Sequence, residues 1–327
     1  MIVSIVIPTY NRPEYLKKAV EAALNQTYPS VEIIISQNPR AEGLESATKQ
    51  WAEQMAATHP QIKYYFNQTN LGIAGNYNAS VDRISGEFAM IIGDDDVLLP
   101  NCIEDLVKYA DKDTDLVFGN RYFIDSKGNP MDSTEHQQKF DEALVPGVVN
   151  DIENIVWRNL VPLTGSIIRT KWLRELRFLP DNTVPDLEFF ARLAANKTRF
   201  YFTDSFVATS RVHGESLTVL GQGTYHLLSE CLIPIPVSSE NKKVKQDLIA
   251  TMIVPAVNQS LQTKNKQLAR MLLHSGFYPK TGKKYGLWMM QNLLTSSPQM
   301  LTDAAFGLLS IYKKMRRAPQ APQSPSF

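Results

Sequence analysis

The sequence predicts an α/β fold of the doubly wound, Rossmann-like class with a mixed sheet, followed by a helical module. Over residues 1–215, short apolar runs that suit strands buried on both faces alternate with amphipathic helical segments. One such run, Phe88–Ile92, stops at Gly93 and is followed at once by three aspartates. From residue 222 onward the strand pattern ends and helical periodicity takes over.

Composition excludes several classes of protein. The chain has 327 residues, 43% of them hydrophobic, so it can bury one large core or two smaller ones. Its 34 Lys and Arg balance 33 Asp and Glu, which gives no reason to expect a nucleic-acid partner. Cys102 and Cys231 have no CxxC spacing and imply neither a disulfide framework nor a zinc site, so a reducing cytoplasm is the simplest location. We also expect no leader and no membrane-spanning run, and hence a protein that is soluble or lies on a membrane surface.

The first half of the fold is predicted to consist of βαβ units. A buried strand at 3–7 leads into a turn where Asn11 can cap a helix and Pro13 suits its first turn. A strand at 31–35 completes the first unit, and its crossover should be right-handed. The pattern then repeats with a helix at 44–55, a strand at 62–66, a helix at 73–84 and the strand at 88–92.

The second half is predicted to be less regular. A helix at 100–110 precedes short strands at 116–118 and 122–124, and residues 125–128 resemble a hairpin turn, which favours a mixed sheet. Residues 131–149 lack periodicity and are predicted to form a loop, for which a lid is one interpretation. Further elements are expected at 163–168, from 186 onward, at 200–202 and at 207–212.

The C-terminal third is predicted to be helical. The helical runs cover residues 226–232, 244–260, 267–273, 285–294 and 301–315. Residues 318–327 are rich in Pro, Gln and Ser and are predicted to be disordered. We therefore divide the chain into an α/β domain at 1–221, a helical module at 222–317 and a tail at 318–327.

The aspartates Asp94, Asp95 and Asp96 form the first candidate functional site. They follow a predicted parallel strand, and ligands of open α/β sheets bind at the carboxyl ends of such strands. Clustered carboxylates there suit Mg²⁺ or Mn²⁺. A solvated acidic turn explains the triplet alone equally well, so the decision depends on which other residues reach the same edge.

Three further stretches lead to that edge. The turn Pro8–Arg12 follows the first strand, Asn70–Gly72 with Asn76 and Asn78 follows the third, and Asp186 and then Arg211–His213 lie downstream. Together with the aspartates, these motifs resemble the family 2 glycosyltransferases of the GT-A fold, over about residues 1–215. The resemblance rests on several motifs in order, and it implies inverting transfer of a sugar from a nucleotide diphosphate to an acceptor hydroxyl.

The resemblance implies roles for the first turn and for the aspartates. Asp94 and Asp96, on either side of Asp95, would bind Mn²⁺ or Mg²⁺ and the donor, because a metal neutralises the charge that grows on the leaving diphosphate. Asn78 would also lie on the donor side. Taken without the family, the first turn is better explained as a helix cap. The residues of this turn that would contact the nucleotide are Pro8, Thr9, Tyr10, Asn11 and Arg12.

Asp186 corresponds to the family's catalytic base, which removes the proton from the acceptor hydroxyl. Arg192-Leu193 aligns with the family's closing Arg-Leu, whereas Pro185 replaces a Glu that often precedes the base, and Glu188 is a competing candidate. Without the family, Asp186 is better explained as a helix-start residue favoured by the helix dipole. His213 resembles a histidine that approaches the metal or diphosphate, although a lone His is as often structural.

One position departs from the family. Where members present an Asp that hydrogen-bonds the uracil ring, this chain has Gln37, whose carbonyl can still accept from the ring N–H but carries no charge. Uridine therefore stays the favoured base of the donor, although Gln37 offers no charge to select it. Gly165 resembles a glycine of the acceptor-side wall, and packing is its alternative role.

The C-terminal helices allow two interpretations. A basic amphipathic segment could lie on an anionic bilayer, close to a lipid-linked acceptor. We favour the other interpretation, a helix packed on its own catalytic domain or on a twin subunit, because apolar helical stripes are usually core. Between Met271 and Arg317 the only acid is Asp303, and the basic residues are Lys280, Lys283, Lys284, Lys313, Lys314, Arg316 and Arg317.

The sequence thus predicts a metal-dependent, inverting glycosyltransferase. A UDP-sugar is the favoured donor, and a saccharide or lipid-linked glycan in cell-surface polysaccharide or glycolipid assembly is the expected acceptor; no motif names the sugar, the acceptor or the oligomeric state. A sugar-nucleotide pyrophosphorylase is the enzymatic alternative, but Pro8–Asn11 lacks the glycines of its phosphate loop. A catalytically silent nucleotide-sugar binding protein is the other alternative. We expect the protein in the cytoplasm, at the inner face of the membrane if the acceptor is lipid-linked.

Overall fold

The computed structural model describes residues 1–10, 12–40, 46–132, 143–180, 185–212, 231–280 and 283–317. The chain divides into two compact units, Met1–Gly223 with Pro234–Lys245 and Thr224–Ile233 with Gln246–Phe327. The boundary predicted at residue 221 and the disordered tail predicted at 318–327 both lie outside the described residues. The proposed division into three segments therefore stays a prediction.

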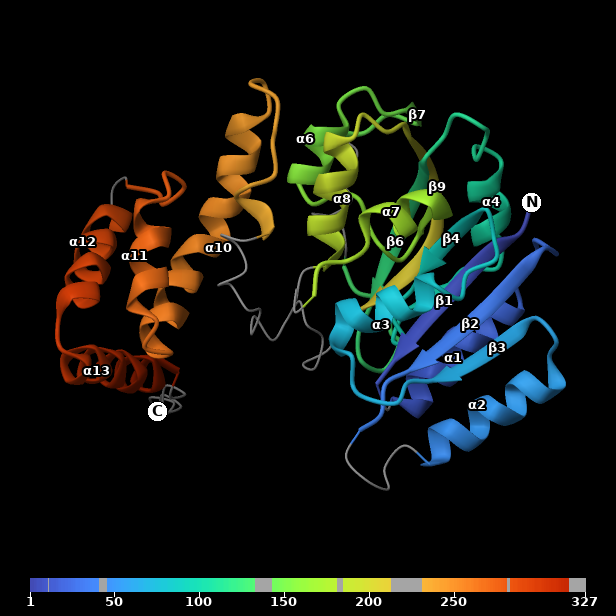
Figure 1. Cartoon of the computed structure of the whole chain (residues 1–327), viewed down its shortest axis with the longest axis horizontal. Helices are drawn as coiled ribbons and strands as arrows, with labels where there is room; N and C mark the ends of the chain where they lie inside the picture. The colour runs from blue at the N-terminus through green and yellow to red at the C-terminus, as the bar shows by residue number, and fades with distance from the viewer. Residues whose placement is uncertain are drawn as a thin grey trace, which may run out of the picture. The chain divides into compact units, whose positions relative to one another are not determined.

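The first four strands of the first unit form the parallel half of its sheet (Figure 1). Strand β1 (Val3–Thr9) lies between β2 (Val31–Gln37) and β4 (Phe88–Ile91), and β3 (Ile62–Phe66) lies outside β2. The chain therefore moves outward from β1 to β3 and then returns to the other side of β1. This reversal makes the β1–β4 pair a topological switch point, where ligands of open α/β sheets bind at the carboxyl ends of the strands.

The other half of the sheet is mixed, as predicted. Strand β8 (Ser166–Arg169) pairs antiparallel with β4 and β6 (Leu116–Ile124), and β6 pairs parallel with β9 (Phe200–Arg211). The short strands β5 (Val97–Leu98) and β7 (Gly147–Val148) pair antiparallel with β9. The sequence predicted two short strands in place of each of β6 and β9. Each is one strand, and the register between them shifts around Asn120, which interrupts the regular alternation.

Both faces of the sheet are covered by helices, which explains the continuous apolar runs of β1, β2 and β4. Alternate residues of β1, such as Val3, Ile5 and Ile7, share one core cluster with residues of α1 (Pro13–Leu24), α2 (Ser46–Thr58) and α4 (Cys102–Val107). Helix α3 (Gly72–Val81) contacts β1 and β2 from the other face and packs on α7 (Thr170–Leu176). Helix α7 in turn packs on α8 (Pro185–Ala195), which packs on α6 (Ile152–Trp157).

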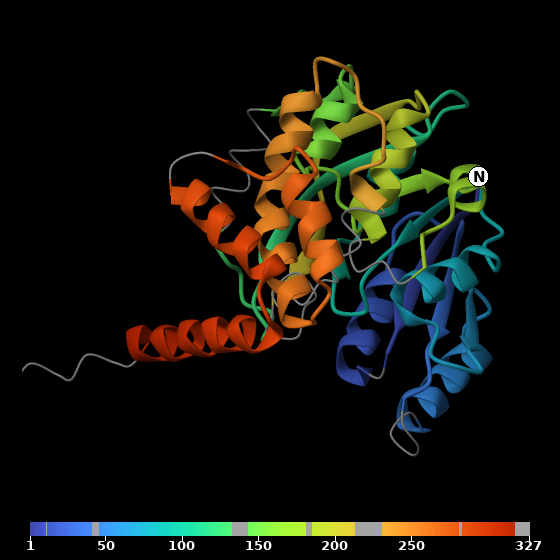
Figure 2. The same cartoon turned by 60° about the vertical axis from the view of Figure 1, so that its left-hand side comes forward.

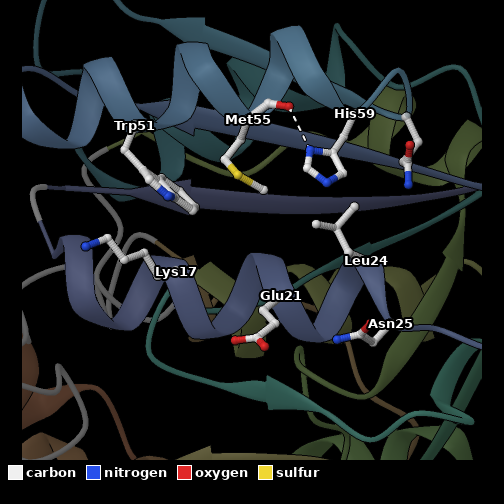
Figure 3. A pocket seen from close by; sticks show the side chains of 8 residues that line it. Lys17, Glu21, Leu24, Asn25, Trp51, Met55 and His59 are labelled. Atoms are coloured by element: carbon white, nitrogen blue, oxygen red, sulfur yellow. Dashed lines mark hydrogen bonds between the residues drawn. The ribbon is translucent and has the colours of Figure 1, made fainter.

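A groove of about 560 Å³ lies between α1 and α2 (Figure 3). Leu24, Trp51 and Met55 form its apolar part, and the ring of His59 lies 3.2 Å from the carbonyl oxygen of Met55. Its lining residues come from the two helices and the turn before β3. None of them is a strand-end residue of the carboxylate cluster described below.

The second unit is helical. Its main elements are the end of α10 (Lys242–Gln262), α11 (Lys266–His274), α12 (Lys283–Ser296) and α13 (Gln299–Arg317), and Figure 2 shows α13 extending away from the other helices of this unit. These confirm four of the predicted helical runs, and most of the fifth, residues 226–232, lies outside the described residues. In the described ranges, no helix has both the length and the hydropathy needed to cross a bilayer. The buried apolar residues of the unit include Ile249, Ile253, Val257, Leu261, Leu272 and Leu273.

Candidate active site

The switch point between β1 and β4 brings the first turn and the aspartate triplet together. In the register of this pair Val6 is opposite Ile91, so Thr9 and Asp94 leave the sheet side by side. The hydroxyl of Thr9 donates a hydrogen bond of 2.6 Å to Asp94. Gly93 precedes the triplet closely enough that a Cβ built there would lie 2.5 Å from Oδ1 of Asp95, so a side chain at this position would displace the triplet.

Arg12 neutralises part of the charge of the triplet. Its guanidinium lies 2.7 Å from Oδ1 of Asp94 and 3.0 Å from Oδ2 of Asp95. Asp94 is nonetheless 1% exposed, and burial raises its pKa to about 6 despite the opposing charge of Arg12 and the hydrogen bond from Thr9. The protein therefore holds this carboxylate in a place where its negative charge is costly.

Asp96 is anchored from the far half of the sheet. Thr164 donates a hydrogen bond of 2.6 Å to its Oδ2, and the backbone N–H of Arg211 donates one of 2.9 Å to its Oδ1. Burial, and then the charge of Asp95, raises the pKa of Asp96 above its usual value. The guanidinium of Arg211 also donates to the carbonyl oxygen of Asp95 at 2.9 Å, so the end of β9 holds both Asp95 and Asp96.

Asp186 lies in the first turn of α8 and is partly exposed. The charges of Asp186 and of the triplet both affect the pKa values of two other side chains, Tyr77 and Arg121. The charges of Asp186, Asp95, Asp94 and Asp96 all add to burial in raising the pKa of Tyr77. Burial lowers the pKa of Arg121, and the charges of Asp96 and Asp186 act in the opposite direction. The expected base and the expected diphosphate anchor are therefore close enough for both to affect the same buried phenol and guanidinium.

Glu188, the competing candidate for the base, is excluded by its surroundings. Its side chain is fully buried and forms a two-point ion pair with Arg192, one turn further along α8. Arg192 also donates to the backbone carbonyl oxygens of Leu176 and Arg177. This pair joins α8 to the end of α7, and a carboxylate so engaged is not available to take a proton from a substrate.

Gln37 lies at the carboxyl end of β2, opposite Thr9, and is fully buried. Tyr64 donates a hydrogen bond of 2.9 Å to its Oε1, and its Nε2 has no hydrogen-bond partner among the described residues. Below it, Ser36, Asn38, Asn67 and Asn76 form a buried hydrogen-bond network that links β2 to α3. The amide of Gln37 is thus held at a strand end with one polar group unused, which normally costs free energy in a buried position.

Asn78 bonds to a distant segment of the chain. Its Nδ2 donates to the carbonyl oxygen of Phe178 at 2.8 Å, and its Oδ1 accepts from the N–H of Phe178 at 2.9 Å. Asn78 therefore has a structural role, and its predicted donor contact stays a prediction. Phe178 in turn packs edge-on against Tyr77, with 5.0 Å between the ring centroids.

The other predicted residues have mixed outcomes. Pro8 is half-buried, and Tyr10 is exposed while its backbone N–H bonds to Asp94. Gly165 has a φ of +100° and its carbonyl oxygen accepts from the N–H of Gly119 at 3.1 Å, so a larger residue there would be strained. Asn11 and His213 lie outside the described residues.

Comparison with known proteins identifies this arrangement. Glycosyl transferase family 2 matches residues 4–174, which include the first turn, the aspartate triplet and Thr164. The chain belongs to glycosyl transferase family 2. It is therefore a glycosyltransferase, and the fold and enzyme class predicted from the sequence are confirmed.

Relatives of this glycosyltransferase align mainly with its first unit. An uncharacterised glycosyltransferase of Methanocaldococcus jannaschii is 29% identical over 220 residues, which cover 64% of this chain and 71% of the relative. The GalNAc(5)-diNAcBac-PP-undecaprenol β-1,3-glucosyltransferase of Campylobacter jejuni is 35% identical over 127 residues, or 38% of this chain and 40% of the relative. An abequosyltransferase of Salmonella typhimurium is 34% identical over 137 residues, or 41% and 39%. The match thus spans less than half the length of the two relatives whose acceptor or sugar is named.

Solved structures support the GT-A fold. Residues 1–349 of S. aureus TarS, in complex with UDP-GlcNAc, superpose with a TM-score of 0.60 at 14% identity, covering 85% of this chain and 88% of that one. The mannosyltransferase PcManGT of Pyrobaculum calidifontis, in complex with GDP-Man and Mn²⁺, gives a TM-score of 0.57 at 16% identity, covering 94% and 86%. At these identities the likeness concerns the fold.

Four residues of the glycosyltransferase site were missed or undervalued at the level of sequence. Thr164 lies in the turn before β8 and Arg121 lies in β6, and nothing near them in the sequence indicates that Thr164 bonds to Asp96 or that the charge of Asp96 affects Arg121. Nothing in the sequence distinguishes Tyr77 from the other apolar residues of its helix, and Arg211 is visible only as part of the motif that ends at His213. Arg121 follows directly on the shift of register in β6, and no local pattern of the sequence encodes this shift.

The donor set fits a divalent metal that is shared with a ligand. Among the described residues, no three His, Cys, Asp or Glu side chains are grouped so as to hold an ion. Mg²⁺ is usually held by one or two carboxylates together with substrate phosphates, so a complete protein cage is not required. Asp96 suits this role best, because burial raises its pKa and it forms no ion pair with any described residue, whereas Asp94 is already paired with Arg12.

Proposed function

We propose that this glycosyltransferase binds a nucleotide-diphosphate sugar, with UDP favoured, at the carboxyl ends of β1, β2 and β4. Asp186 then takes the proton of the acceptor hydroxyl as its oxygen attacks the anomeric carbon. The bond from that carbon to the diphosphate oxygen breaks on the opposite side, so the configuration inverts. The leaving nucleotide diphosphate keeps the electron pair of the broken bond.

The observation that carries the proposal is the common neighbourhood of Asp186 and the triplet. The charges of Asp186 and Asp96 both raise the pKa of the Tyr77 phenol and both oppose the lowering of the pKa of Arg121 by burial. A base must lie within reach of the attacking hydroxyl, and the diphosphate anchor must lie on the other side of the sugar. A pocket about the size of one sugar between the two groups would meet this requirement, and Tyr77 and Arg121 are the side chains that would border it.

The cationic groups support the departure of the diphosphate. Arg12 already faces Asp94 and Asp95, and its guanidinium could turn one N–H toward a phosphate oxygen without leaving the carboxylates. Mn²⁺ or Mg²⁺, when bound, would neutralise the charge that develops on the diphosphate. We expect Asp96 to hold it, with Asp94 and His213 as the other candidate ligands.

The base of the donor is expected to meet Gln37. Its buried amide keeps one polar group unused, which a nucleobase edge could satisfy. Because Tyr64 can donate or accept, the amide can present either its carbonyl or its N–H to the ligand. Uridine stays the favoured base through the carbonyl of Gln37, and an amide that can present either group would select it more weakly than a carboxylate.

The acceptor is proposed to be the hydroxyl of a saccharide or of a lipid-linked glycan. The named C. jejuni relative acts on an undecaprenol-linked saccharide, which supports the second choice. The enzyme would then work in the cytoplasm, at the inner face of a membrane that carries the acceptor.

A thermal-shift panel tests the donor site. We expect UDP with Mn²⁺ to raise the Tm more than GDP, CDP or UDP alone, and Asp96→Ala to lose the metal-dependent part of the shift. Equal shifts for the three nucleotides would overturn the preference for uridine.

Release of nucleotide diphosphate separates an enzyme from a silent binding protein. We expect slow, Mn²⁺-dependent hydrolysis of a suitable UDP-sugar even without an acceptor, because water can replace the acceptor hydroxyl. Binding of a UDP-sugar with no release of UDP, with or without acceptor saccharides, would favour the silent alternative.

A further inference from the structure

The near-neutral charge of the chain hides a strong division between its two parts. Residues 246–327 contain ten Lys or Arg and two Asp or Glu, and residues 1–245 contain the remaining 24 and 31. The formal charges are therefore +8 and −7, within a total of +1. A basic module of this kind attached to an acidic domain indicates an anionic partner for the module alone.

The same module exposes an unusual amount of apolar surface. Sixteen large hydrophobic side chains are exposed among the described residues, and eight of them lie within residues 271–308. On α12, Tyr285, Met289 and Leu293 follow one another at intervals of four residues and are 48%, 54% and 70% exposed. Residues at this spacing share one face of a helix, so α12 presents an apolar stripe to solvent.

Helix α13 continues the pattern. Met300, Leu301 and Leu308 are 76%, 53% and 69% exposed, while Thr302 between them is fully buried. Positions 300, 301, 304 and 308 fall on one side of an ideal helix, and Ala304 is also exposed. The C-terminal part of the same helix carries four basic residues in its sequence: Lys313, Lys314, Arg316 and Arg317.

Helix α11 adds a row of basic residues at the same four-residue interval. Lys266, Arg270 and His274 line a groove of about 490 Å³ together with Gln267, Met271 and Thr295. Their hydrogen-bond partners are neutral groups: Lys266 bonds to the carbonyl oxygen of Ser297, Arg270 to the hydroxyl of Ser296, and His274 to the amide of Asn292. These bonds do not compensate the positive charge of Lys266 and Arg270, so the row attracts anions.

We propose that the C-terminal helical unit is a docking module for an anionic lipid bilayer, in which the exposed apolar residues of α12 and α13 enter the headgroup region and the surrounding Lys and Arg bind lipid phosphates. Exposed Met and Leu side chains are costly in water and are stabilised at the boundary between headgroups and acyl chains. Each basic residue near an anionic leaflet strengthens the binding further.

Charge complementarity favours a bilayer over the alternatives. Two copies of the module would repel each other at +8 each. A nucleic acid would match the charge but would leave the apolar stripes in water. The negative charge of residues 1–245 would keep the first unit off an anionic surface, so the module alone would make the contact. This inference goes beyond the sugar transfer and does not depend on which donor is used.

Flotation of the full-length protein with vesicles tests the proposal. One set of vesicles contains phosphatidylcholine alone, and the other contains equal parts of phosphatidylcholine and phosphatidylglycerol. We expect binding to the anionic vesicles, at least about tenfold weaker binding to the neutral ones, and weaker binding in 0.5 M salt because salt screens the attraction. Absence of binding to the anionic vesicles at low salt would overturn the proposal.

Two variants separate apolar from electrostatic contributions. The triple variant Leu293→Gln, Leu301→Gln and Leu308→Gln changes only exposed positions and should keep its circular dichroism spectrum and Tm. The matched control is Val145→Gln, at an apolar residue of the first unit that is 80% exposed. We expect the triple variant to bind anionic vesicles at least about tenfold more weakly than wild type and the control to bind like wild type.

The remaining outcomes are decisive as well. If the triple variant binds as tightly as wild type, the contact is purely electrostatic and the proposed insertion is wrong. If light scattering shows that the wild type forms a stable dimer which the triple variant loses, while neither binds vesicles, the stripes cover a second copy and the bilayer proposal falls.

Discussion

Two buried carboxylates at opposite ends of the same sheet, Glu32 and Asp94, have pKa values shifted in opposite directions. Glu32, near the start of β2, is 6% exposed and accepts hydrogen bonds from the hydroxyls of Ser4 and Ser85, the ammonium of Lys63 and the N–H of Ser85. Although burial acts to raise its pKa, these donors outweigh it and lower the pKa to about 2. Asp94, at the other end, is as deeply buried, but its pKa is raised to about 6.

The difference supports the proposal that Glu32 stabilises the fold and that the aspartates bind a ligand. Glu32 has its charge satisfied by the protein, so its ionised form stabilises the native state. Asp94 and Asp96 lie beside the charge of Asp95, and burial raises their pKa values despite their hydrogen-bond donors. A bound cation would remove this cost, as expected of a functional carboxylate.

The largest effect is expected from the base. Asp186→Asn should lower the rate of transfer by about 10² to 10⁴ while leaving the Tm within a degree or two of wild type, because an amide of equal size cannot take the proton. The rate is measured by release of UDP in the presence of acceptor. Glu188→Gln serves as a contrast: it breaks the buried pair with Arg192 and should lower the Tm instead. Full activity in Asp186→Asn would reject the assignment.

Asp96→Asn tests the ligand end of the comparison. The variant should unfold at or above the Tm of wild type without ligand, because it removes a like charge, and should lose the stabilisation by Mn²⁺ and UDP. That stabilisation is about 2.7 kcal/mol at a ligand concentration one hundred times Kd. Differential scanning fluorimetry with and without both ligands measures it. A marked fall in the Tm of the ligand-free variant would mean that Asp96 stabilises the fold as Glu32 does.

Glu32→Gln tests the structural end. The substitution should cost about 1–3 kcal/mol of unfolding free energy at pH 7, since Lys63 and the donors from Ser4 and Ser85 lose a charged acceptor. Folded Glu32 titrates at about 2, well below its ordinary value of 4.5, so its contribution is present above pH 4.5 and is lost as the pH falls toward 2. The Tm values of wild type and variant should therefore converge as the pH falls from about 4.5 toward 2. Activity per folded molecule should stay unchanged at pH 7.

The smallest effect is expected at Gln37. In Gln37→Glu a carboxylate can only accept, so the preference for UDP over CDP should rise, by up to about tenfold, because uracil offers a ring N–H where cytosine offers an acceptor. Competition of UDP and CDP for a fluorescent UDP analogue measures this preference. Tyr64→Phe is the control, since it removes the partner of Gln37 without adding charge. An unchanged ratio in Gln37→Glu would show that Gln37 does not contact the base.

The sequence predicted those parts of the fold that depend on local patterns. The apolar runs of β1, β2 and β4 and the inward face of α8 are visible because each has its own periodicity. The continuity of β6 and β9 was missed, since Gly119, Asn120 and the residues around Asp204 resemble turns when their partner strand is unknown. The predicted hairpin turn at 125–128 does lie in a turn, and Ile124 pairs antiparallel with Pro130 beyond it.

The site divides in the same way. The triplet, the first turn and Asp186 could be proposed from motifs, but the contacts that give them their chemistry come from distant segments. Thr164 reaches Asp96 across 68 positions of sequence, and Asn78 bonds to Phe178 across 100. For the C-terminal helices we favoured packing on the catalytic domain or on a twin subunit, because apolar helical stripes are usually part of a core. Leu293, Met300 and Leu308 are exposed, and the vesicle and light-scattering experiments decide between that interpretation and a bilayer.

Arg211 has a consequence for how the donor end of the enzyme can vary. Besides holding Asp95, its guanidinium donates to the carbonyl oxygen of Asp125 at 3.0 Å and lies 5.0 Å from the ring centre of Tyr15. One side chain thus connects the turn that carries Asp95 to an external hairpin and to α1. Lengthening or replacing that hairpin would shift the carboxylates although none of them is changed. We therefore expect substitutions in the hairpin to alter donor affinity from a distance.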